Sequence, residues 1–259
     1  MSEENNYVFA NEREGRFGAL EELYDQHTAR HIEALRPSAG WTCLEIGAGA
    51  GSIARHLSRR IAPGKVVATD LDISRLTQLA PFGIEVWRHD IGRDPLPEHI
   101  FDFVHARLVL MHLPDAASAL SRVIRSLKPG GWLLVEEFDA GALLDGETGP
   151  FGEAASRTSL ATRAAMQDGG IDLRYGRRLP ALFSTHGLVE IGGEARMSLW
   201  RGASPGTRLM RANYAALRSA ILSAGAVTSD EFERDVARLD DARFAMWSPT
   251  MWSVWGRST

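Results

Sequence analysis

The sequence predicts an α/β fold in which helices cover both faces of a mostly parallel β-sheet. Three observations lead to this prediction. From residue 41 to residue 138, short apolar segments rich in Val, Ile and Leu alternate with amphipathic segments, which is typical of a parallel sheet buried on both sides. A glycine-rich turn, LEIGAGAG at 44–51, follows the first apolar segment, and acidic residues follow several later ones.

The predicted elements follow one another in a regular order. Residues 14–35 place apolar and aromatic side chains mostly three or four positions apart, which indicates an amphipathic helix that Pro37 ends. We then expect strands at 41–46, 65–69, 84–88, 101–106 and 132–138, with helices at 52–61, 73–80 and 115–127. Asp115 is expected to cap the last of these helices, and the LKPGG segment at 127–131 is expected to form a turn after it.

After residue 138 the alternation is looser. We expect helices at 151–167, 175–186, 206–223 and 228–239, a sixth strand within 186–200 and a last strand within 244–257. Thr228 and Glu231 have the spacing of a capping box. Pro249 lies inside the last predicted strand and indicates an edge position or a bulge. Since no repeat or linker divides the chain, we expect one domain over residues 1–259.

The composition narrows the class of protein. The chain has 259 residues, 44% of them hydrophobic, and a formal net charge of −4, which provides no general attraction for nucleic acid or anionic membranes. No apolar run approaches the roughly 18 residues of a membrane-spanning helix, and the polar amino terminus lacks the pattern of a signal peptide. The one cysteine, Cys43, lies in an apolar strand segment. We expect a cytoplasmic protein with neither nucleic acid nor membrane as a partner.

The glycines at 47, 49 and 51 fall where a strand should turn into a helix. Such a turn brings backbone N–H groups and a helix N-terminus to one point, which suits a nucleotide-like ligand. A dinucleotide motif requires its third glycine at position 52, where this chain has Ser52, and Glu45 precedes the first glycine instead. The glycines by themselves leave open whether the ligand is a dinucleotide or another nucleotide-like molecule.

Acidic residues at later strand ends extend this pattern. Asp70 ends the second predicted strand, where a carboxylate can accept hydrogen bonds from both ribose hydroxyls. Asp90 ends the third, where it can accept from an adenine amino group while Ile91 lies against the ring. The fifth strand carries Glu136 and Glu137. Because the ends of parallel strands meet at one edge of the sheet, we expect these residues to line one ligand site.

The ordered segments EIGAGAG, VVATD, WRHDI, FDFVHARLVLMHLPD and LKPGGWLLVEEF resemble the class I S-adenosylmethionine-dependent methyltransferases. The resemblance covers residues 41–138. The fourth segment followed by LKPGG is most similar to the small-molecule enzymes of the ubiquinone-biosynthesis type and their natural-product relatives. The resemblance implies a Rossmann-like sheet of seven strands whose last strand is antiparallel.

The resemblance also implies positions for the site. S-adenosyl-L-methionine would be bound by Glu45, Gly47, Gly49, Gly51, Asp70, Leu71, Asp90, Ile91, Ala106 and Arg107. Residues 41–138 would form the cofactor-binding core, and 14–36 a helical lid over the cofactor that stays outside the sheet core. Insertions at 139–243, around the sixth strand, would cover the acceptor, and 244–257 would form the terminal strand.

Methyl transfer needs a base where the acceptor must lose a proton. Candidates at the expected edge are His105, His112, Glu136 and Glu137, with Tyr24 and His31 on the lid. Side chains alternate along a strand, so Glu136 and Glu137 should face opposite sides of the sheet. We predict His112 as the base and Glu137 as the carboxylate that orients it, with no metal.

The sequence predicts methyl transfer to a small molecule, on O, N or C, in secondary or quinone-like metabolism. Two alternatives remain open: an enzyme that keeps the cofactor but catalyses cyclisation, decarboxylation or hydroxylation, and a non-enzymatic cofactor-binding protein. Ser52 disfavours a nicotinamide-dependent oxidoreductase. A homodimer is compatible with the sequence.

Overall fold

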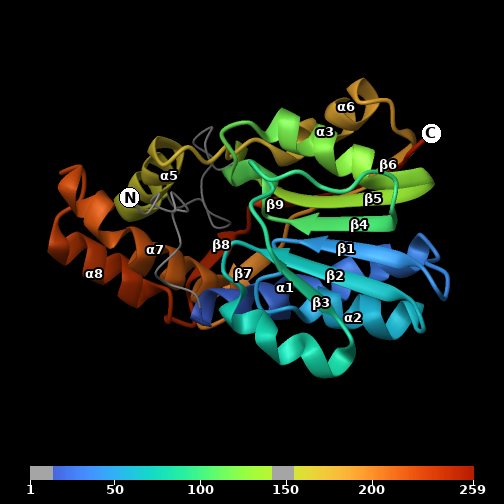
Figure 1. Ribbon diagram of the computed structural model, residues 1–259. Helices are drawn as coiled ribbons and strands as arrows, with labels where there is room; N and C mark the ends of the chain where they lie inside the picture. Colours follow the sequence, from blue (N-terminus) through green and yellow to red (C-terminus); the bar gives the residue numbers. More distant parts are fainter. Residues whose placement is uncertain (1–13, 142–154) are drawn as a thin grey trace, which may run out of the picture. The chain divides into compact units, whose positions relative to one another are not determined.

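The computed structural model describes residues 14–141 and 155–259 (Figure 1). The chain separates into two compact units. The sheet unit comprises Asp25–Phe138, Arg174–Ala195 and Met251–Thr259. The helical unit comprises Asp139–Leu173, Arg196–Thr250 and the residues up to Tyr24. Helix α1 (Glu14–Ala34) contributes its first half to the helical unit and its second half to the sheet unit.

The sheet unit contains seven strands in the order β3-β2-β1-β4-β5-β9-β6. They are β1 (Thr42–Ile46), β2 (Lys65–Asp70), β3 (Glu85–Arg88), β4 (Phe101–Arg107), β5 (Leu127–Asp139), β6 (Val189–Arg196) and β9 (Thr250–Arg257). The pairs β1–β2, β1–β4, β2–β3 and β4–β5 are parallel, and the last strand is antiparallel. The predicted Rossmann-like sheet is therefore confirmed.

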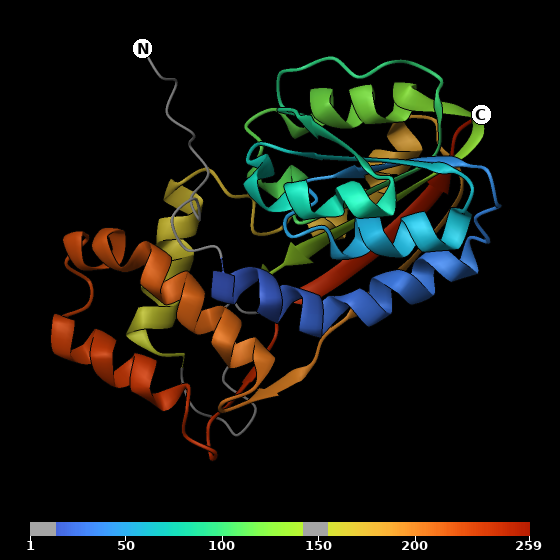
Figure 2. The same cartoon turned by 60° about the horizontal axis from the view of Figure 1, so that its bottom comes forward.

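Helices cover both faces of this sheet. They are α2 (Ser52–Ile61), the 3₁₀ segments η1 (Ile73–Phe82), η2 (Leu110–His112) and η3 (Gly176–Arg178), α3 (Ala116–Ser126) and α6 (Leu179–Thr185). Figure 2 shows α1 and α2 on one side of the sheet and α3 on the other. Asp115 caps α3 as predicted, because its side chain accepts a hydrogen bond from the Ser118 N–H. The fully buried Leu57, Phe103 and Leu134 lie in the hydrophobic core between these layers.

The predicted turn at 127–131 is wrong, because β5 already begins at Leu127. Phe101 of β4 is paired with Leu127, whereas Phe103 is paired with Trp132. The extra residues between Leu127 and Trp132 form a bulge, in which Gly130 adopts a left-handed φ of 76°. A bulge lets a Pro-Gly-Gly sequence stay within a strand.

The predicted last strand at 244–257 is divided in the structure. Its first part, β8 (Ala245–Trp247), pairs antiparallel with β7 (Leu199–Arg201) in a separate two-stranded sheet. Its second part is β9, which lies between β5 and β6. Pro249 falls between the two parts and lacks the N–H that a continuous ladder would need. The predicted edge position is therefore wrong for β9, and β6 forms that edge instead.

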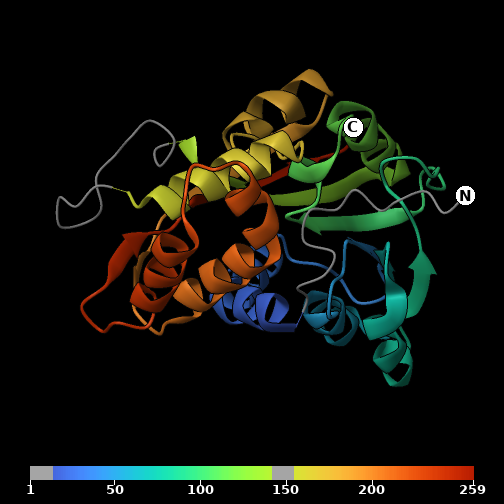
Figure 3. The ribbon, with the colours of Figure 1, turned by 90° about the vertical axis from the view of Figure 1, so that its left-hand side faces the viewer.

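The helical unit is built from α5 (Arg157–Asp168), α7 (Pro205–Ser223) and α8 (Ser229–Arg238), which lie side by side (Figure 3). The predicted capping box at α8 is confirmed, since Thr228 and Glu231 exchange side-chain and backbone hydrogen bonds. Of the helix predicted at 151–167, residues 151–154 lie outside the described part. So do residues 142–150 of the segment expected to cover the acceptor.

The second half of α1 belongs to the sheet core. Ile32 is fully buried within the main hydrophobic cluster, whereas in the helical unit Arg16 donates a hydrogen bond to Asn213 of α7 at 3.1 Å. The expectation that residues 14–36 stay outside the core is therefore wrong for the second half. Its function as a lid over the cofactor stays a prediction.

Candidate functional site

The glycine loop connects β1 to α2 at the carboxyl end of the sheet. Gly47, Gly49 and Gly51 all have left-handed φ angles, of 65°, 58° and 83°, which glycine adopts without steric cost. A Cβ at Gly47 would also lie 2.4 Å from Cγ2 of Val109. Gly51 is the N-cap of α2, so the loop presents its backbone next to the positive end of a helix.

Asp70, the last residue of β2, is hydrogen-bonded to this loop. Its Oδ2 accepts a hydrogen bond from the Gly49 N–H at 2.9 Å, and Oδ1 accepts from the Asp72 N–H at 3.2 Å. A carboxylate offers about four acceptor positions, and these two backbone bonds fix the orientation of the Asp70 carboxylate at the loop. Leu71, which follows, has an exposed side chain. Binding of the ribose by Asp70, as the motifs implied, stays a prediction.

Asp90 and Ile91 lie after β3. The Asp90 carboxylate accepts from the Gly92 N–H at 2.9 Å, and its side chain is one-third exposed. Ile91 is buried, and its carbonyl accepts from Arg122 at 2.6 Å. A carboxylate that bonds a backbone N–H two residues ahead stabilises a tight turn. Oδ2 of Asp90 lies 3.8 Å from Nε of Arg93. Contact of Asp90 and Ile91 with adenine stays a prediction.

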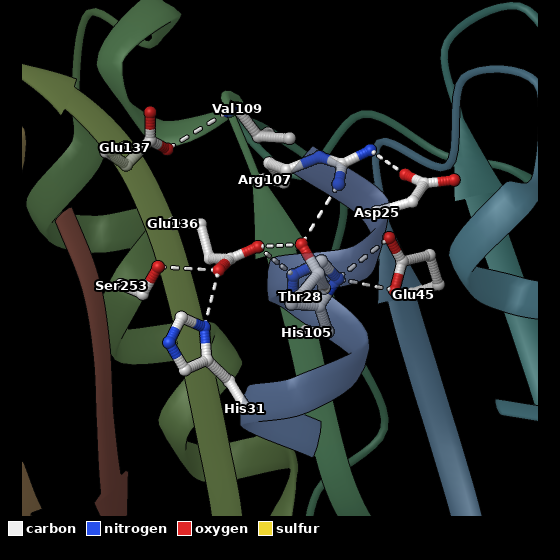
Figure 4. Close-up of polar contacts among 10 residues, drawn as sticks. All are labelled: Asp25, Thr28, His31, Glu45, His105, Arg107, Val109, Glu136, Glu137 and Ser253. Atoms are coloured by element: carbon white, nitrogen blue, oxygen red, sulfur yellow. Dashed lines mark hydrogen bonds and ion pairs between the residues drawn. The ribbon is translucent and has the colours of Figure 1, made fainter. Parts of the chain in front are cut away.

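A buried polar cluster lies on one face of the sheet beside the loop (Figure 4). Glu45 of β1 is paired in register with His105 of β4, and Arg107 of β4 with Glu136 of β5. Nδ1 of His105 lies 2.8 and 2.9 Å from the two carboxylate oxygens of Glu45, and Nε2 lies 3.4 Å from Oε2 of Glu136. One imidazole therefore bridges two carboxylates. Glu45, predicted to bind the cofactor, directs its carboxylate to His105 in this structure.

Helix α1 and strand β9 complete the cluster around Glu136. The Thr28 hydroxyl donates to Oε2, Nδ1 of His31 lies 3.1 Å from Oε1, and the Ser253 hydroxyl donates to Oε1 at 2.6 Å. All of these side chains are buried. Sequence reasoning did not single out Thr28 or Ser253, because neither stands in a motif.

Arg107 links the cluster to the next turn of α1. Its Nη1 donates to Thr28 at 3.0 Å and its Nη2 donates to Asp25 at 2.8 Å. Asp25, Thr28 and His31 are spaced three residues apart and so lie along one side of the helix. The neighbouring Ala106, also predicted beside the cofactor, is buried in β4.

The charges of the cluster stabilise one another. Burial by itself lowers the pKa of His105, but Glu45 and Glu136 outweigh it and raise that pKa to about 9. Burial raises the pKa of Glu136, yet hydrogen bonds from His105 and His31 hold it well below its usual range. Hydrogen bonds to the charged form favour ionisation even in a buried site. His105 and Glu136 therefore stabilise each other's charged forms.

The side chain of Glu137 points to the face of the sheet opposite that of Glu136, and it accepts hydrogen bonds from backbone N–H groups. Its Oε1 accepts from the N–H groups of Val109 and Leu110, at 3.0 and 2.6 Å. These residues begin the turn η2, which ends at His112. The structure thus gives Glu137 a part in holding the turn that carries His112. The pairing of His112 with Glu137 as base and orienting residue stays a prediction.

Over residues 14–141 and 155–259, no group of three or more His, Cys, Asp or Glu side chains is placed to hold a metal ion. Among the helices of that same part of the chain, none has both the length and the apolar character needed to cross a membrane.

A family of methyltransferase domains accounts for this combination of fold and loop. The model of the methyltransferase domain family matches residues 15–191, which is more than half of the chain. The chain belongs to this methyltransferase family. The family predicted from the sequence motifs is therefore confirmed. Its match also supports S-adenosylmethionine as the cofactor, as those motifs implied.

Individual relatives of this methyltransferase agree with that assignment. The methyltransferase str2 of Strobilurus tenacellus is 34% identical over 152 residues, covering 57% of this chain and 54% of str2. The ubiquinone/menaquinone biosynthesis C-methyltransferase UbiE of Hahella chejuensis is 37% identical over 109 residues, covering 39% of this chain and 44% of UbiE. The chain spans about half the length of the curated relatives it matches.

The fold is similar to those of solved structures. The phosphoethanolamine N-methyltransferase 2 of Haemonchus contortus matches with a TM-score of 0.60 and 15% sequence identity. That match covers 98% of this chain and 59% of the solved one. At this identity the likeness shows the fold alone.

Proposed function

We propose that this methyltransferase transfers the methyl group of S-adenosylmethionine to a small-molecule acceptor. The observation that carries the proposal is the joining of the glycine loop to Asp70 at the carboxyl end of the sheet. A loop of left-handed glycines at a helix start suits the polar methionine part, and the carboxylate of Asp70 suits the ribose. Asp90 and Ile91 would hold the adenine.

When bound, S-adenosylmethionine supplies a methyl group on a sulfonium centre, and the protein supplies position and desolvation. In our proposal His112 accepts a proton from the acceptor, where the acceptor must lose one. Glu137 contributes by binding the Val109 and Leu110 N–H groups, which fixes the start of the turn that bears His112.

The class of acceptor rests on the relatives and on the chain outside the core. The name of UbiE describes ubiquinone and menaquinone biosynthesis, and that of the Haemonchus contortus enzyme describes methylation of phosphoethanolamine nitrogen. We propose a small metabolite, methylated on O, N or C, with residues 139–243 providing its binding surface. Residues 14–36 would act as a lid, in a cytoplasmic protein that binds neither nucleic acid nor membrane and is able to form a homodimer.

Product analysis tests the proposal. Purified protein is incubated with S-adenosylmethionine carrying an isotope-labelled methyl group and with metabolite fractions of the host. The label should appear in a small molecule, with S-adenosylhomocysteine released in equal amount. A changed acceptor without label would instead indicate a non-methylating enzyme of this fold. Binding of cofactor with no acceptor changed in any fraction would favour a non-enzymatic role.

A further inference from the structure

Helix α1 is held on the sheet by polar groups as well as by apolar ones. Asp25, Thr28 and His31 are all bonded to charged residues of the sheet, next to the buried Ile32. A helix of a globular protein ordinarily packs through an apolar stripe. Docking of this half of α1 therefore depends on hydrogen bonds to the cluster as well as on apolar packing.

The other end of the cluster is close to the glycine loop in the chain. Glu45 is two residues before Gly47, and its carboxylate is bonded to His105. His105 is fully buried and reaches Glu136 with its second ring nitrogen. Glu136 in turn accepts hydrogen bonds from α1. Within this buried polar cluster, His105 therefore links the strand that leads into the loop to the carboxylate that binds the helix.

We propose that His105 is a positioning residue that couples cofactor binding at the glycine loop to the docking of α1 on the sheet. This inference rests on the proposed function, because it needs a cofactor at the loop. The geometry supports it, since each ring nitrogen of His105 faces a different carboxylate. An imidazole donates from both nitrogens only when it is protonated.

The surroundings of His105 show which groups act on it. Glu45 faces it from β1 and Glu136 from β5, while Thr28 and His31 of α1 share the Glu136 carboxylate. Arg107 of β4 and Ser253 of β9 complete the set. Loss of the imidazolium would leave two buried carboxylates without their common cation, which is strongly destabilising in a buried site. The end of β1 that leads into the glycine loop and the packing of α1 on the sheet would then both be less stable.

Hydrogen exchange with S-adenosylhomocysteine as the probe tests the coupling. In the unaltered protein, saturating probe should slow amide exchange in residues 25–34 of α1 by about tenfold, within the usual range of coupling between sites. In His105→Gln the same amides should exchange faster without probe, and the probe should no longer slow them. Calorimetry should show that His105→Gln binds the probe about tenfold more weakly than the unaltered protein does.

Two further variants keep the test decisive should His105→Gln fail to fold. Thr28→Val removes the hydroxyl that α1 donates to Glu136 and leaves the Glu45–His105 pair in place. It should also abolish the effect of the probe on α1. Val123→Ala opens a cavity at a fully buried position of α3, outside the cluster. This matched control should lower the melting temperature but retain the effect of the probe on α1.

The outcomes separate the inference from the proposed function. If the unaltered protein does not bind S-adenosylhomocysteine, both are overturned. If it binds the probe but exchange in residues 25–34 does not change, the coupling is overturned and the proposed function stands. The coupling is likewise overturned if Thr28→Val or a folded His105→Gln still shows the full effect of the probe. Loss of that effect in the cluster variants but not in Val123→Ala supports it.

Discussion

Glu136 and Glu137 are neighbours along β5, and their carboxylates lie on opposite faces of the sheet. Glu136 accepts hydrogen bonds from Thr28 and Ser253 in the buried cluster, whereas Glu137 binds the backbone of the turn η2. The alternation of side chains along a strand predicts this divergence. One acidic pair therefore stabilises two different parts of the site.

The first prediction concerns the stability that Glu137 provides. Glu137→Gln should lower the free energy of unfolding by about 1–3 kcal/mol, because hydrogen bonds to a charged acceptor become bonds to a neutral amide. Urea denaturation measures this change. The matched variant Glu136→Gln should cost about 3–5 kcal/mol, since it leaves the partner charges buried and uncompensated. Equal stability of Glu137→Gln and the unaltered protein would show that the negative charge of the acceptor adds nothing to these two backbone bonds.

Local sequence patterns are sufficient to predict most strands of the sheet and the glycine loop. The alternation of apolar and amphipathic segments predicts the parallel strands, and the caps at Asp115 and Thr228 follow from side-chain chemistry within one helical turn. The edge of the sheet that carries Asp70 and Asp90 follows from the parallel arrangement. Each of these features depends on residues close together in the chain.

The polar cluster depends on residues far apart in the chain. His105 is 60 residues from Glu45 and 31 from Glu136, and only the strand order brings them together. The periodicity of residues 14–35 predicts the helix α1 and its buried side, but it does not show that Thr28 and His31 on that side bind Glu136. The division of the last predicted strand at Pro249 likewise depends on distant residues, because β8 pairs with β7 whereas β9 lies between β5 and β6.

The second prediction tests His112 as the base. His112→Ala should lower turnover by a factor of about 10²–10⁴, the usual contribution of a general base, while cofactor affinity is nearly unchanged. Steady-state kinetics and calorimetry measure the two quantities. His186→Gln, at the end of α6, serves as a matched histidine control with unchanged turnover. Activity retained in His112→Ala would mean that positioning alone accounts for catalysis.

The third prediction tests Asp70. Asp70→Ala should weaken binding of S-adenosylhomocysteine by about 1.5–3 kcal/mol, because a charged acceptor of the ribose and the tether of Gly49 are both lost. Asp72→Ala removes the neighbouring cap of η1 and should reduce stability with little effect on affinity. Calorimetry on both folded variants makes the comparison. Unchanged affinity in Asp70→Ala would remove the ribose assignment.

The fourth prediction concerns a partly buried cation in the helical unit. Arg163 of α5 donates to Ser159 at 3.1 Å, but within the described chain its buried Nη2 has no hydrogen-bond partner. Burial lowers the pKa of Arg163. Arg163→Met keeps the apolar stem and should raise the free energy of unfolding by about 1 kcal/mol, as replacements of buried charges often do.

Arg157 provides the control for that experiment. Its guanidinium is exposed and lies 3.1 Å from Glu231, so Arg157→Met should change the stability by less than about 0.5 kcal/mol. Urea denaturation of both variants measures the difference. A destabilised Arg163→Met would show that Nη2 finds an acceptor in solution.

The last prediction is the pH dependence of stability that the cluster imposes. The pKa of His105 is raised from 6.5 to about 9 in the folded protein, so its contribution is complete below about pH 6.5 and is lost as the pH rises through 9. The pKa of Glu136 is held well below 4.5, so its contribution is complete above pH 4.5 and is lost at lower pH. These two groups together favour maximal stability between about pH 4.5 and 6.5.

Urea midpoints measured from pH 4 to pH 10 should therefore decline on the alkaline side in the unaltered protein. In His105→Gln the part of this decline that lies between pH 6.5 and 9 should disappear, because the group that loses its proton there is gone. His99→Gln, which alters a histidine outside the cluster, should keep the full decline. If the urea midpoints of His105→Gln and the unaltered protein decline equally between pH 6.5 and 9, His105 does not carry its proton between Glu45 and Glu136 in the folded state.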